Sequence, residues 1–390
     1  MAVHCELIEV AHSEDVVGSL VARMLQKSVV IAILGALEDA ISRMAPWLCR
    51  IENWAEHRSL RGRLYVGGRA KTKMEIPIKT SPLIHIGYHK TGTTWLQQHL
   101  FDRREAGYCT PIQRSHILGV LVKPNQLDFD AMTCRSRLAP SLARESEKGL
   151  IPVVTCERLS GNPHSGGYDT WQIAHRLVDV FPEARVLIVI REQTSIILSC
   201  YKQYVKAGGT MPIETYLHPP HDFKVPRFDF QHFAYDRAIR LYQSLFGPER
   251  VLVLAYEQFQ SNGAEFVKRI ACFAGATAPD ASGAISLLAK VENRGMTSVR
   301  LMLRRSLNHL AAKPTTLNPQ PYFASRRAAG TVASGATILA SVVPQFLNMR
   351  MELALRRYVA LAAKDQYGAS NRAVIALTGL PLENLGYALG

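Results

Sequence analysis

The sequence has few of the features that build metal sites and disulfide frameworks. Its 390 residues include seven cysteines, which is an odd number, and no two of them have the C-x-x-C spacing. Cys156 and Cys200 lie in or beside apolar runs. We therefore expect free thiols that pack as small apolar side chains in a reducing compartment, and neither a zinc site nor a disulfide framework.

The sequence also lacks a convincing secretory signal and a clear membrane span. Residues 1–18 are mixed, whereas a signal peptide has a basic start and an apolar centre. The stretch 330–349 approaches the length of a span, but it is rich in Ala, Gly, Ser and Thr and contains Pro344. We expect a buried helix or helix pair there, and a cytoplasmic protein for which peripheral membrane contact remains open.

Acidic residues are outnumbered by basic ones. Asp and Glu total 32 against 46 Lys and Arg, a net charge of +14. Such an excess attracts polyanions or an anionic membrane surface. The basic residues are scattered without an aromatic–basic repeat, so no nucleic acid partner is expected. An acidic acceptor such as a uronic-acid glycan remains open, as does a charge that serves solubility alone.

Apolar runs alternate with amphipathic segments through the middle of the chain. The pattern predicts strands at 83–87, 151–156, 186–190 and 251–254, and helices at 93–101, 170–180 and 194–205. It indicates an α/β fold of the P-loop type, with three α/β/α layers around a mainly parallel central sheet. Helical N- and C-terminal extensions are also predicted. Residues 1–79 form an accessory region before a domain at 80–390, in which the organisation of 296–364 stays open.

A glycine-bounded loop follows the first predicted strand. From Gly87 to Gly92 the spacing matches the G-x-x-x-x-G of a nucleotide P-loop, but Thr93 stands where the P-loop lysine belongs. The lysine occurs three residues earlier, at Lys90. Backbone N–H groups in such a loop, together with the start of the next helix, can hold a phosphate. The displaced lysine should approach that anion from the other side.

A second candidate anion site follows the strand at 186–190. Arg191 comes directly after this strand, and Ser199 lies eight residues later on the next predicted helix. The two can converge on one anion, because arginine supplies a fork of donors and serine a single one. No acidic residue closes this strand, so the Mg²⁺-binding carboxylate of a P-loop nucleoside triphosphatase is not expected there. In open α/β sheets ligands gather at such strand ends.

Both segments resemble the sulfotransferases that use 3′-phosphoadenosine-5′-phosphosulfate (PAPS), and in particular bacterial, carbohydrate-sulfotransferase-like members. In that family the lysine contacts the oxygen that bridges phosphate and sulfate, the threonine pair binds the 5′-phosphate, the tryptophan stacks on adenine, and the Arg–Ser pair binds the 3′-phosphate. The resemblance requires no metal. It implies donor-binding roles for Gly87, His89, Lys90, Thr91, Gly92, Thr93, Thr94, Trp95, Arg191, Ser199, Tyr256, Arg294 and Gly295.

The resemblance also places a catalytic base just after the strand at 151–156. The family uses histidine there in small-molecule enzymes and glutamate in many carbohydrate enzymes, and this chain has Glu157. It therefore implies in-line sulfuryl transfer to an acceptor hydroxyl, with a glycan or glycolipid as the acceptor. Glu157 acts as the base and Lys90 stabilises the leaving group. His164 is the alternative base, and His89 is expected to be structural or a supporting donor.

Two other functions stay open. A P-loop nucleotide kinase or phosphotransferase would need a lysine at position 93 and an acidic strand end. A non-catalytic PAPS-binding protein would keep the donor site without transfer. The C-terminal segments 367–372 and 380–387 favour the sulfotransferase, because they resemble a helix and the Leu-x-x-Leu-Gly-Tyr ending of bacterial members.

Overall fold

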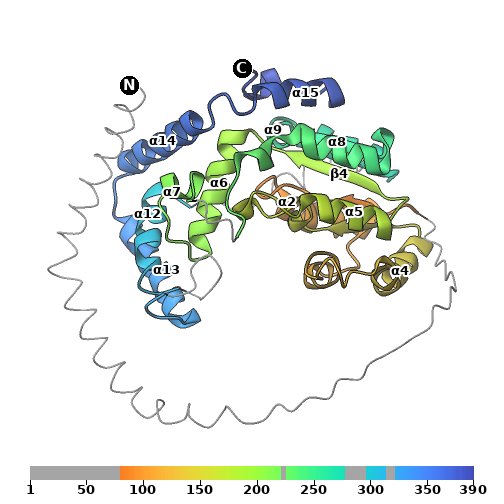
Figure 1. Ribbon diagram of the computed structural model, residues 1–390, viewed down its shortest axis with the longest axis horizontal. Helices are drawn as coiled ribbons and strands as arrows, with labels where there is room; N and C mark the ends of the chain where they lie inside the picture. The colour runs from red at the N-terminus through yellow and green to blue at the C-terminus, as the bar shows by residue number, and fades with distance from the viewer. Residues whose placement is uncertain (1–79, 221–224, 277–295, 313–320) are drawn as a thin grey trace, which may run out of the picture. The chain divides into compact units, whose positions relative to one another are not determined.

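The structure is a computed structural model, which describes residues 80–220, 225–276, 296–312 and 321–390 (Figure 1). The predicted accessory region at 1–79 lies outside the described residues. Its helical character and the domain boundary at residue 80 therefore stay predictions.

Five strands form one parallel sheet in the order β2-β3-β1-β4-β5. The strands are β1 (Leu83–His85), β2 (Tyr108–Cys109), β3 (Ile151–Thr155), β4 (Arg185–Ile190) and β5 (Val251–Ala255). The chain leaves β1 for β2 and β3 on one side and later enters β4 on the other. The carboxyl end of β1 is therefore a topological switch point, the place where open α/β sheets bind ligands.

Helices cover both faces of the sheet, because alternate strand residues point to opposite sides. Ile84, Val154 and Ile188 share one buried cluster with residues of α4 (Ala131–Glu147), α5 (Thr170–Val180) and α8 (Tyr235–Phe246). Leu83, Val153 and Leu187 share another with α2 (Thr93–Leu96), the π-helical turn Gln97–Phe101 and α10 (Gly263–Ala274). The predicted three-layer α/β/α fold is confirmed.

The elements around the switch point match the predictions closely. The helix expected at 93–101 is α2 followed directly by the π-helical turn, and the one at 194–205 is α6 (Gln193–Lys206). Between them lie the short α3 (Arg114–Ile117) and two 3-10 turns, Glu157–Ser160 and Pro163–Ser165. After α6 come α7 (Ile213–Leu217) and, beyond β5, α9 (Tyr256–Ser261).

The C-terminal part is helical, as predicted. It consists of α12 (Ser298–Asn308), α13 (Arg326–Ser341), α14 (Gln345–Ala362) and α15 (Gly368–Thr378). Helices α12 and α14 both pack on α6, and α15 packs on α8. The sequence left the organisation of 296–364 open. In the structure its described part consists of helices, of which α12 and α14 pack on α6.

The stretch 330–349 is a helix pair, but the prediction that it is buried is wrong. Ala336 is fully buried, whereas Ile338 is 67% and Val342 76% exposed. Other small residues of α13, such as Ser334 and Ser341, are exposed as well, so the helix lies largely on the surface. No single described helix is long and apolar enough to cross a membrane, while α13 and α14 together meet that test as a pair bent by 113°.

The described cysteines are free thiols, as predicted. Cys109, Cys134, Cys156 and Cys200 are buried, and Cys272 is exposed. Burial raises the pKa of the Cys134 thiol to about 11. These four buried thiols act as small apolar side chains of the core.

Candidate active site

The loop after β1 is held in a conformation that few residues adopt. Gly87, Lys90 and Gly92 have φ angles of 43°, 70° and 79°. A positive φ is unusual for a lysine and occurs mostly where the surroundings fix the backbone, often at functional sites. The Thr91 hydroxyl contributes to this by donating to the Tyr88 carbonyl at 2.6 Å. The displaced lysine therefore lies at a sharp left-handed turn of the loop.

Both loop glycines are required by close packing as well as by φ. A Cβ at Gly87 would lie 2.7 Å from the Thr93 Cγ2, and a Cβ at Gly92 would lie 3.0 Å from the Tyr256 ring. Tyr256, the first residue after β5, thus packs on the loop from the end of a strand two places away from β1. Neither position has space for a larger residue than glycine.

Arg191 joins the loop to the second predicted anion site. Its Nη1 donates to the Lys90 carbonyl at 2.9 Å and lies 3.5 Å from the Ser199 hydroxyl. Its guanidinium carbon is 4.9 Å from the centre of the Tyr256 ring, within cation–π range. Four residues that are predicted to contact the donor, from the ends of three strands and from α6, therefore meet around one guanidinium.

Lys90 is exposed, yet neighbouring atoms partly desolvate its ammonium. That burial lowers the pKa of Lys90, and the positive charges of Lys206, Arg191 and Lys202 act in the same direction. A lysine with a lowered pKa is both a positive charge and a better proton donor. These are the two properties that a leaving oxygen requires.

The three residues that follow Gly92 begin helix α2. Thr93 and Trp95 are buried, and Thr94 is half-buried. The Trp95 ring, 4% exposed, packs against Phe259 with ring centres 4.7 Å apart. Trp95 therefore lies largely within the apolar layer below the loop, and its stacking on adenine stays a prediction.

A buried polar chain supports the loop from below. His85 Nδ1 and Thr155 Oγ1 are 2.9 Å apart, and Gln97 Nε2 donates to the same oxygen at 3.1 Å. Burial lowers the pKa of His85 to about 3, so the ring is neutral at pH 7. These hydrogen bonds tie the ends of β1 and β3 to the π-helical turn that follows the loop and α2. No pattern in the sequence indicated them.

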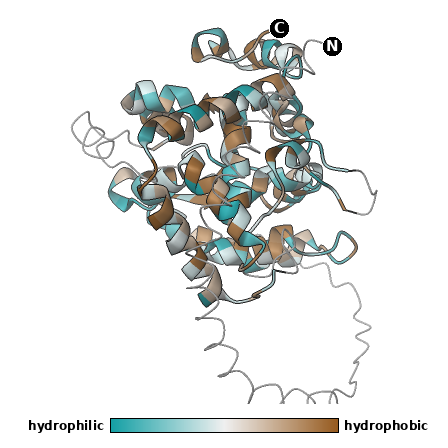
Figure 2. Cartoon of the chain, turned by 90° about the vertical axis from the view of Figure 1, so that its left-hand side faces the viewer, coloured by the Kyte–Doolittle hydropathy of each residue, from teal (hydrophilic) through white to brown (hydrophobic). Residues whose placement is uncertain are grey.

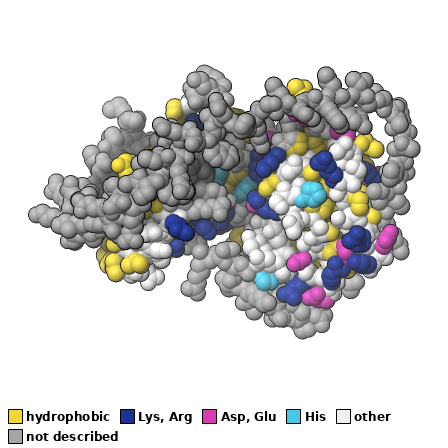
Figure 3. Space-filling view, turned by 90° about the horizontal axis from the view of Figure 1, so that it is seen from below, with side chains coloured by type: hydrophobic (Ala, Val, Ile, Leu, Met, Phe, Trp, Pro, Cys, Tyr) yellow, Lys and Arg dark blue, Asp and Glu magenta, His cyan; other side chains and the backbone are white. Residues whose placement is uncertain are grey.

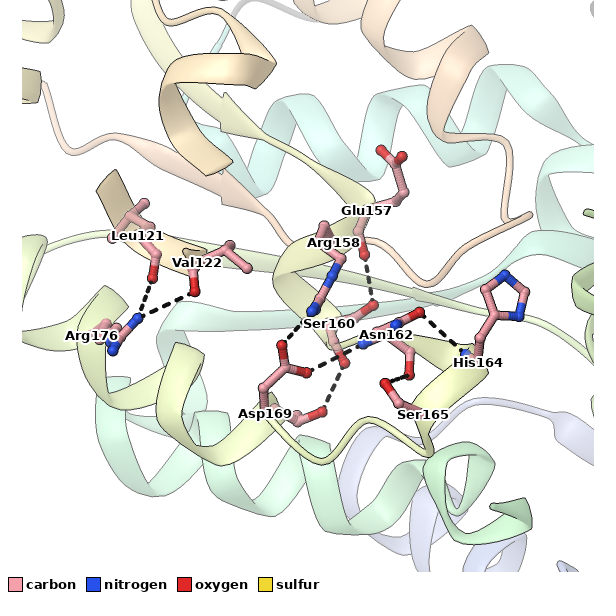
Figure 4. A network of polar contacts seen from close by, with 11 residues as sticks. Leu121, Val122, Glu157, Arg158, Ser160, Asn162, His164, Ser165, Asp169 and Arg176 are labelled. Carbon is pink, nitrogen blue, oxygen red and sulfur yellow. Dashed lines mark hydrogen bonds and ion pairs between the residues drawn. The ribbon is translucent and has the colours of Figure 1, made fainter. Parts of the chain in front are cut away.

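Glu157 follows β3, and its carboxylate pairs with Arg114 of α3 at 2.9 Å. The neighbouring Arg158 bonds instead to Asp169, at 2.5 Å. In Figure 4 the Glu157 side chain points away from the network that Arg158 and Asp169 form. Glu157 therefore pairs with Arg114, whereas the carboxylate partner of Arg158 is Asp169.

Three histidines lie within electrostatic range of one another beside the loop: His89, His164 and His232. Burial is the largest cause that lowers each pKa, to about 4 for His164 and His232 and well below the usual value for His89. His164 Nδ1 and the Tyr216 hydroxyl are 2.9 Å apart. Among the described residues, neither His89 Nδ1 nor His232 Nε2 has a hydrogen-bond partner. All three rings are neutral at pH 7.

Residues far along the chain hold the Arg191 strand end in place. Glu192 accepts hydrogen bonds from the backbone N–H groups of Thr194 and Ser195, at 2.7 and 2.9 Å, and so caps α6. Glu257 accepts from the Glu192 N–H at 2.9 Å and from the Tyr387 hydroxyl at 3.0 Å. No sequence pattern predicts these contacts, and the ending that contains Tyr387 stood out only by its resemblance to bacterial sulfotransferases.

Helix α15 supplies a second brace. The amides of Gln193 and Asn371 are bonded at 2.7 Å, and Asn371 Nδ2 also donates to the Ala388 carbonyl at 2.7 Å. Glu192, which directly follows Arg191, uses its carboxylate to cap α6. The predicted contact residues Arg294 and Gly295 lie outside the described residues.

Part of the sequence that forms this site is similar to a known protein family. A family model described as the sulfotransferase family matches residues 168–280. This part of the chain is similar in sequence to that family. The segment contains Arg191, Ser199 and Tyr256 but not the phosphate loop, so the match is independent of the loop that first indicated a sulfotransferase. The predicted resemblance is confirmed at the level of the family. Its bacterial, carbohydrate-type detail stays a prediction.

Solved sulfotransferases are similar to the chain at low identity. They include a sulfotransferase from Alicyclobacillus acidocaldarius (18% identity, 54% of this chain and 86% of that one, TM-score 0.39). Mouse sulfotransferase SULT7A1 complexed with PAP is another (12%, 76% and 87%, 0.32). The sulfotransferase domain from the curacin biosynthetic pathway is a third (14%, 66% and 98%, 0.35). No curated protein matches.

Proposed function

We propose that the protein transfers a sulfuryl group from PAPS to the hydroxyl of an acceptor, and that the acceptor is a glycan or glycolipid. The observation that carries this proposal is the contact of Arg191 with the Lys90 carbonyl, the Ser199 hydroxyl and the Tyr256 ring. These contacts place a fork of donors between the displaced lysine and the serine of the next helix. A donor with two separate anionic groups fits such a site.

The residues suit this donor chemically. Gly87 and Gly92 permit the tight course of the loop, since a Cβ at either would meet the Thr93 or Tyr256 side chain, and backbone N–H groups of such a loop are the donors that a phosphate needs. In the proposed arrangement Thr93 and Thr94 donate to the 5′-phosphate, and Arg191 and Ser199 donate to the 3′-phosphate. Lys90 faces the oxygen that leaves with the phosphate. Its lowered pKa favours donation of a proton to that oxygen as negative charge develops.

Glu157 is the proposed base. Its carboxylate lies at the end of the strand next to β1, 20% exposed, and Arg114 holds it at 2.9 Å. It would accept the proton of the acceptor hydroxyl as the oxygen attacks sulfur. Strand ends that adjoin the phosphate loop are where a base can reach a nucleophile in line with the leaving oxygen.

His164 is a second candidate for the same step. Its ring is neutral at pH 7 because burial lowers its pKa to about 4, and Tyr216 contacts only its Nδ1. In Figure 4 the His164 ring and the Glu157 carboxylate both lie outside the Arg158–Asp169 network. Either group could therefore accept a proton.

A pair of conservative variants separates the two candidates. Removal of a general base slows transfer by about 10²–10⁴-fold. With labelled PAPS and a panel of glycans, glycolipids and phenols, Glu157→Gln should lose turnover to this extent and keep its affinity for the product 3′-phosphoadenosine-5′-phosphate (PAP). His164→Gln should keep most turnover. The reverse pattern would make His164 the base, and transfer to phenols alone would refute the carbohydrate acceptor.

The same assay tests the two alternative functions. A kinase or phosphotransferase would transfer phosphate from ATP and require Mg²⁺, whereas sulfuryl transfer should proceed with a chelator present. A non-catalytic PAPS-binding protein would bind PAP and leave every acceptor unmodified. A cytoplasmic location is part of the proposal, because the buried free thiols suit a reducing compartment.

A further inference from the structure

The corner between α13 and α14 carries an outward apolar stripe. Ile338, Val342, Phe346, Met349 and Leu353 follow one another at intervals of three or four residues and are between 55% and 76% exposed. Within α14 that spacing places Phe346, Met349 and Leu353 on one side of the helix. Ile338 and Val342 lie at the end of α13, on the other arm of the 113° bend. Figure 1 places these helices on the left, and Figure 2 shows the molecule from that side.

The inward side of α14 is already packed. Leu355 and Val359 are buried in the main core cluster, and α14 packs on α6 and α12. The helix therefore has two apolar sides, of which the fold uses one. A soluble protein rarely exposes apolar side chains in a contiguous stripe unless the stripe contacts something.

The segment that carries the stripe is strongly basic. Residues 296–364 contain ten Lys and Arg residues and one acidic residue, Glu352. That carboxylate is neutralised by Lys202 of α6 at 2.7 Å. Arg327, Arg350 and Arg356 are exposed on α13 and α14. Figure 3 shows basic side chains beside apolar ones on the left, the side on which Figure 1 places α12 and α13.

We propose that the α13–α14 corner docks the protein on an anionic membrane surface, with the apolar stripe in the headgroup region and the arginines on the lipid phosphates. Helices with apolar and basic residues side by side bind at such interfaces without crossing them. A nucleic acid or an acidic glycan would match the charge but leave the stripe exposed to water. A membrane accounts for both features.

The docking surface lies one helix away from the donor site. Glu352 of α14 accepts from Lys202, and Ser199, which lies beside Arg191, is one turn earlier on the same α6. Membrane docking would therefore hold the transferase site close to lipid headgroups. The binding step itself is independent of the proposed sulfuryl transfer and can be measured without it.

Vesicle flotation of the full chain tests the proposal. The protein should float with phosphatidylcholine–phosphatidylserine vesicles, remain in solution with phosphatidylcholine alone, and dissociate as salt is raised. The double variant Phe346→Ser/Leu353→Ser should weaken binding by at least about tenfold, because two apolar side chains no longer enter the interface. Each substitution Arg327→Gln or Arg350→Gln should weaken it by about fivefold.

Matched controls use other exposed residues. Leu127 and Met132 are 94% and 57% exposed, and Arg137 is exposed on α4. The variants Leu127→Ser/Met132→Ser and Arg137→Gln should bind vesicles like the parent chain. The proposal would be overturned if the chain bound both vesicle types equally, or if Phe346→Ser/Leu353→Ser bound as well as the parent chain. It would also be overturned if the parent chain did not float and instead formed a dimer that Phe346→Ser/Leu353→Ser dissociates.

Discussion

Arg191 offers the most direct perturbation of the donor site. Its Nη1 contacts the Lys90 carbonyl at 2.9 Å and lies 3.5 Å from the Ser199 hydroxyl. A hydrogen bond to a charged group contributes about 1.5–3 kcal/mol. If Arg191 holds the 3′-phosphate, Arg191→Ala should therefore raise the Kd of PAP by about 10- to 150-fold at 25 °C.

Calorimetric titration with two nucleotides makes the assignment specific. PAP carries a 3′-phosphate and AMP does not, so Arg191→Ala should weaken PAP and leave AMP almost unchanged. Arg191→Lys keeps the charge but loses the fork, and should fall between parent and alanine variant. Ser199→Ala removes one neutral donor and should cost about 0.5–1.5 kcal/mol, or roughly 2- to 13-fold.

Arg250 provides the matched control. It pairs with Glu183 at 3.0 Å, just before β5 and therefore at the opposite end of the sheet, so Arg250→Ala should leave both affinities unchanged. An equal loss of PAP and AMP affinity in Arg191→Ala would refute the 3′-phosphate role. It would instead mean that Arg191 acts by holding the Lys90 turn. No loss for either nucleotide would refute the donor site at this strand end.

Two further predictions concern stability. Tyr387→Phe removes one of the donors to Glu257 and should lower the free energy of unfolding by about 1 kcal/mol in chemical denaturation, with a parallel rise in the Kd of PAP. No change in either quantity would mean that the brace is not needed. The folded-state pKa values of His164 and His232 lie near 4, below the ordinary 6.5, so the unfolded chain binds more protons as pH falls below 6.5. Each ring should therefore lower the free energy of unfolding by about 2 kcal/mol between pH 7 and pH 5. The buried His85 and His89 rings, whose pKa values are also lowered, add to the measured loss. His164→Gln should therefore reduce that loss by about 2 kcal/mol, whereas the exposed His116→Gln should keep the full pH dependence.

The sheet could be predicted because its strands are buried on both faces and are therefore apolar throughout. Each predicted strand matches β1, β3, β4 or β5 to within two residues at either end. Strand β2 has only two residues, Tyr108 and Cys109, which is too short for any pattern to show. The exposure of α13 and α14 was missed because composition gives the apolar fraction of a helix but not which side faces solvent.

The candidate site could be predicted in part for a related reason. Chemistry at strand ends is visible in sequence, and parallel strands bring their ends together, so the meeting of Arg191, Ser199 and the loop was expected. The hydrogen-bond partners of the Glu157 and Glu257 carboxylates were not expected. Arg114 lies 43 residues before its carboxylate and Tyr387 130 residues after its own. No local pattern encodes contacts at such separations.

The braces at Gln193 and Glu257 bear on when the site can form during synthesis. All five strands have left the ribosome once residue 255 has emerged. The partner of Gln193 is Asn371, 178 residues later, and the partner of Glu257 is Tyr387, 130 residues later. Domains fold from the N-terminus as they emerge. A growing chain can therefore assemble its sheet early, while the strand end that carries Arg191 gains these supports only after Asn371 and Tyr387 have emerged. A ribosome-bound chain that stops before residue 371 should be folded yet bind PAP poorly.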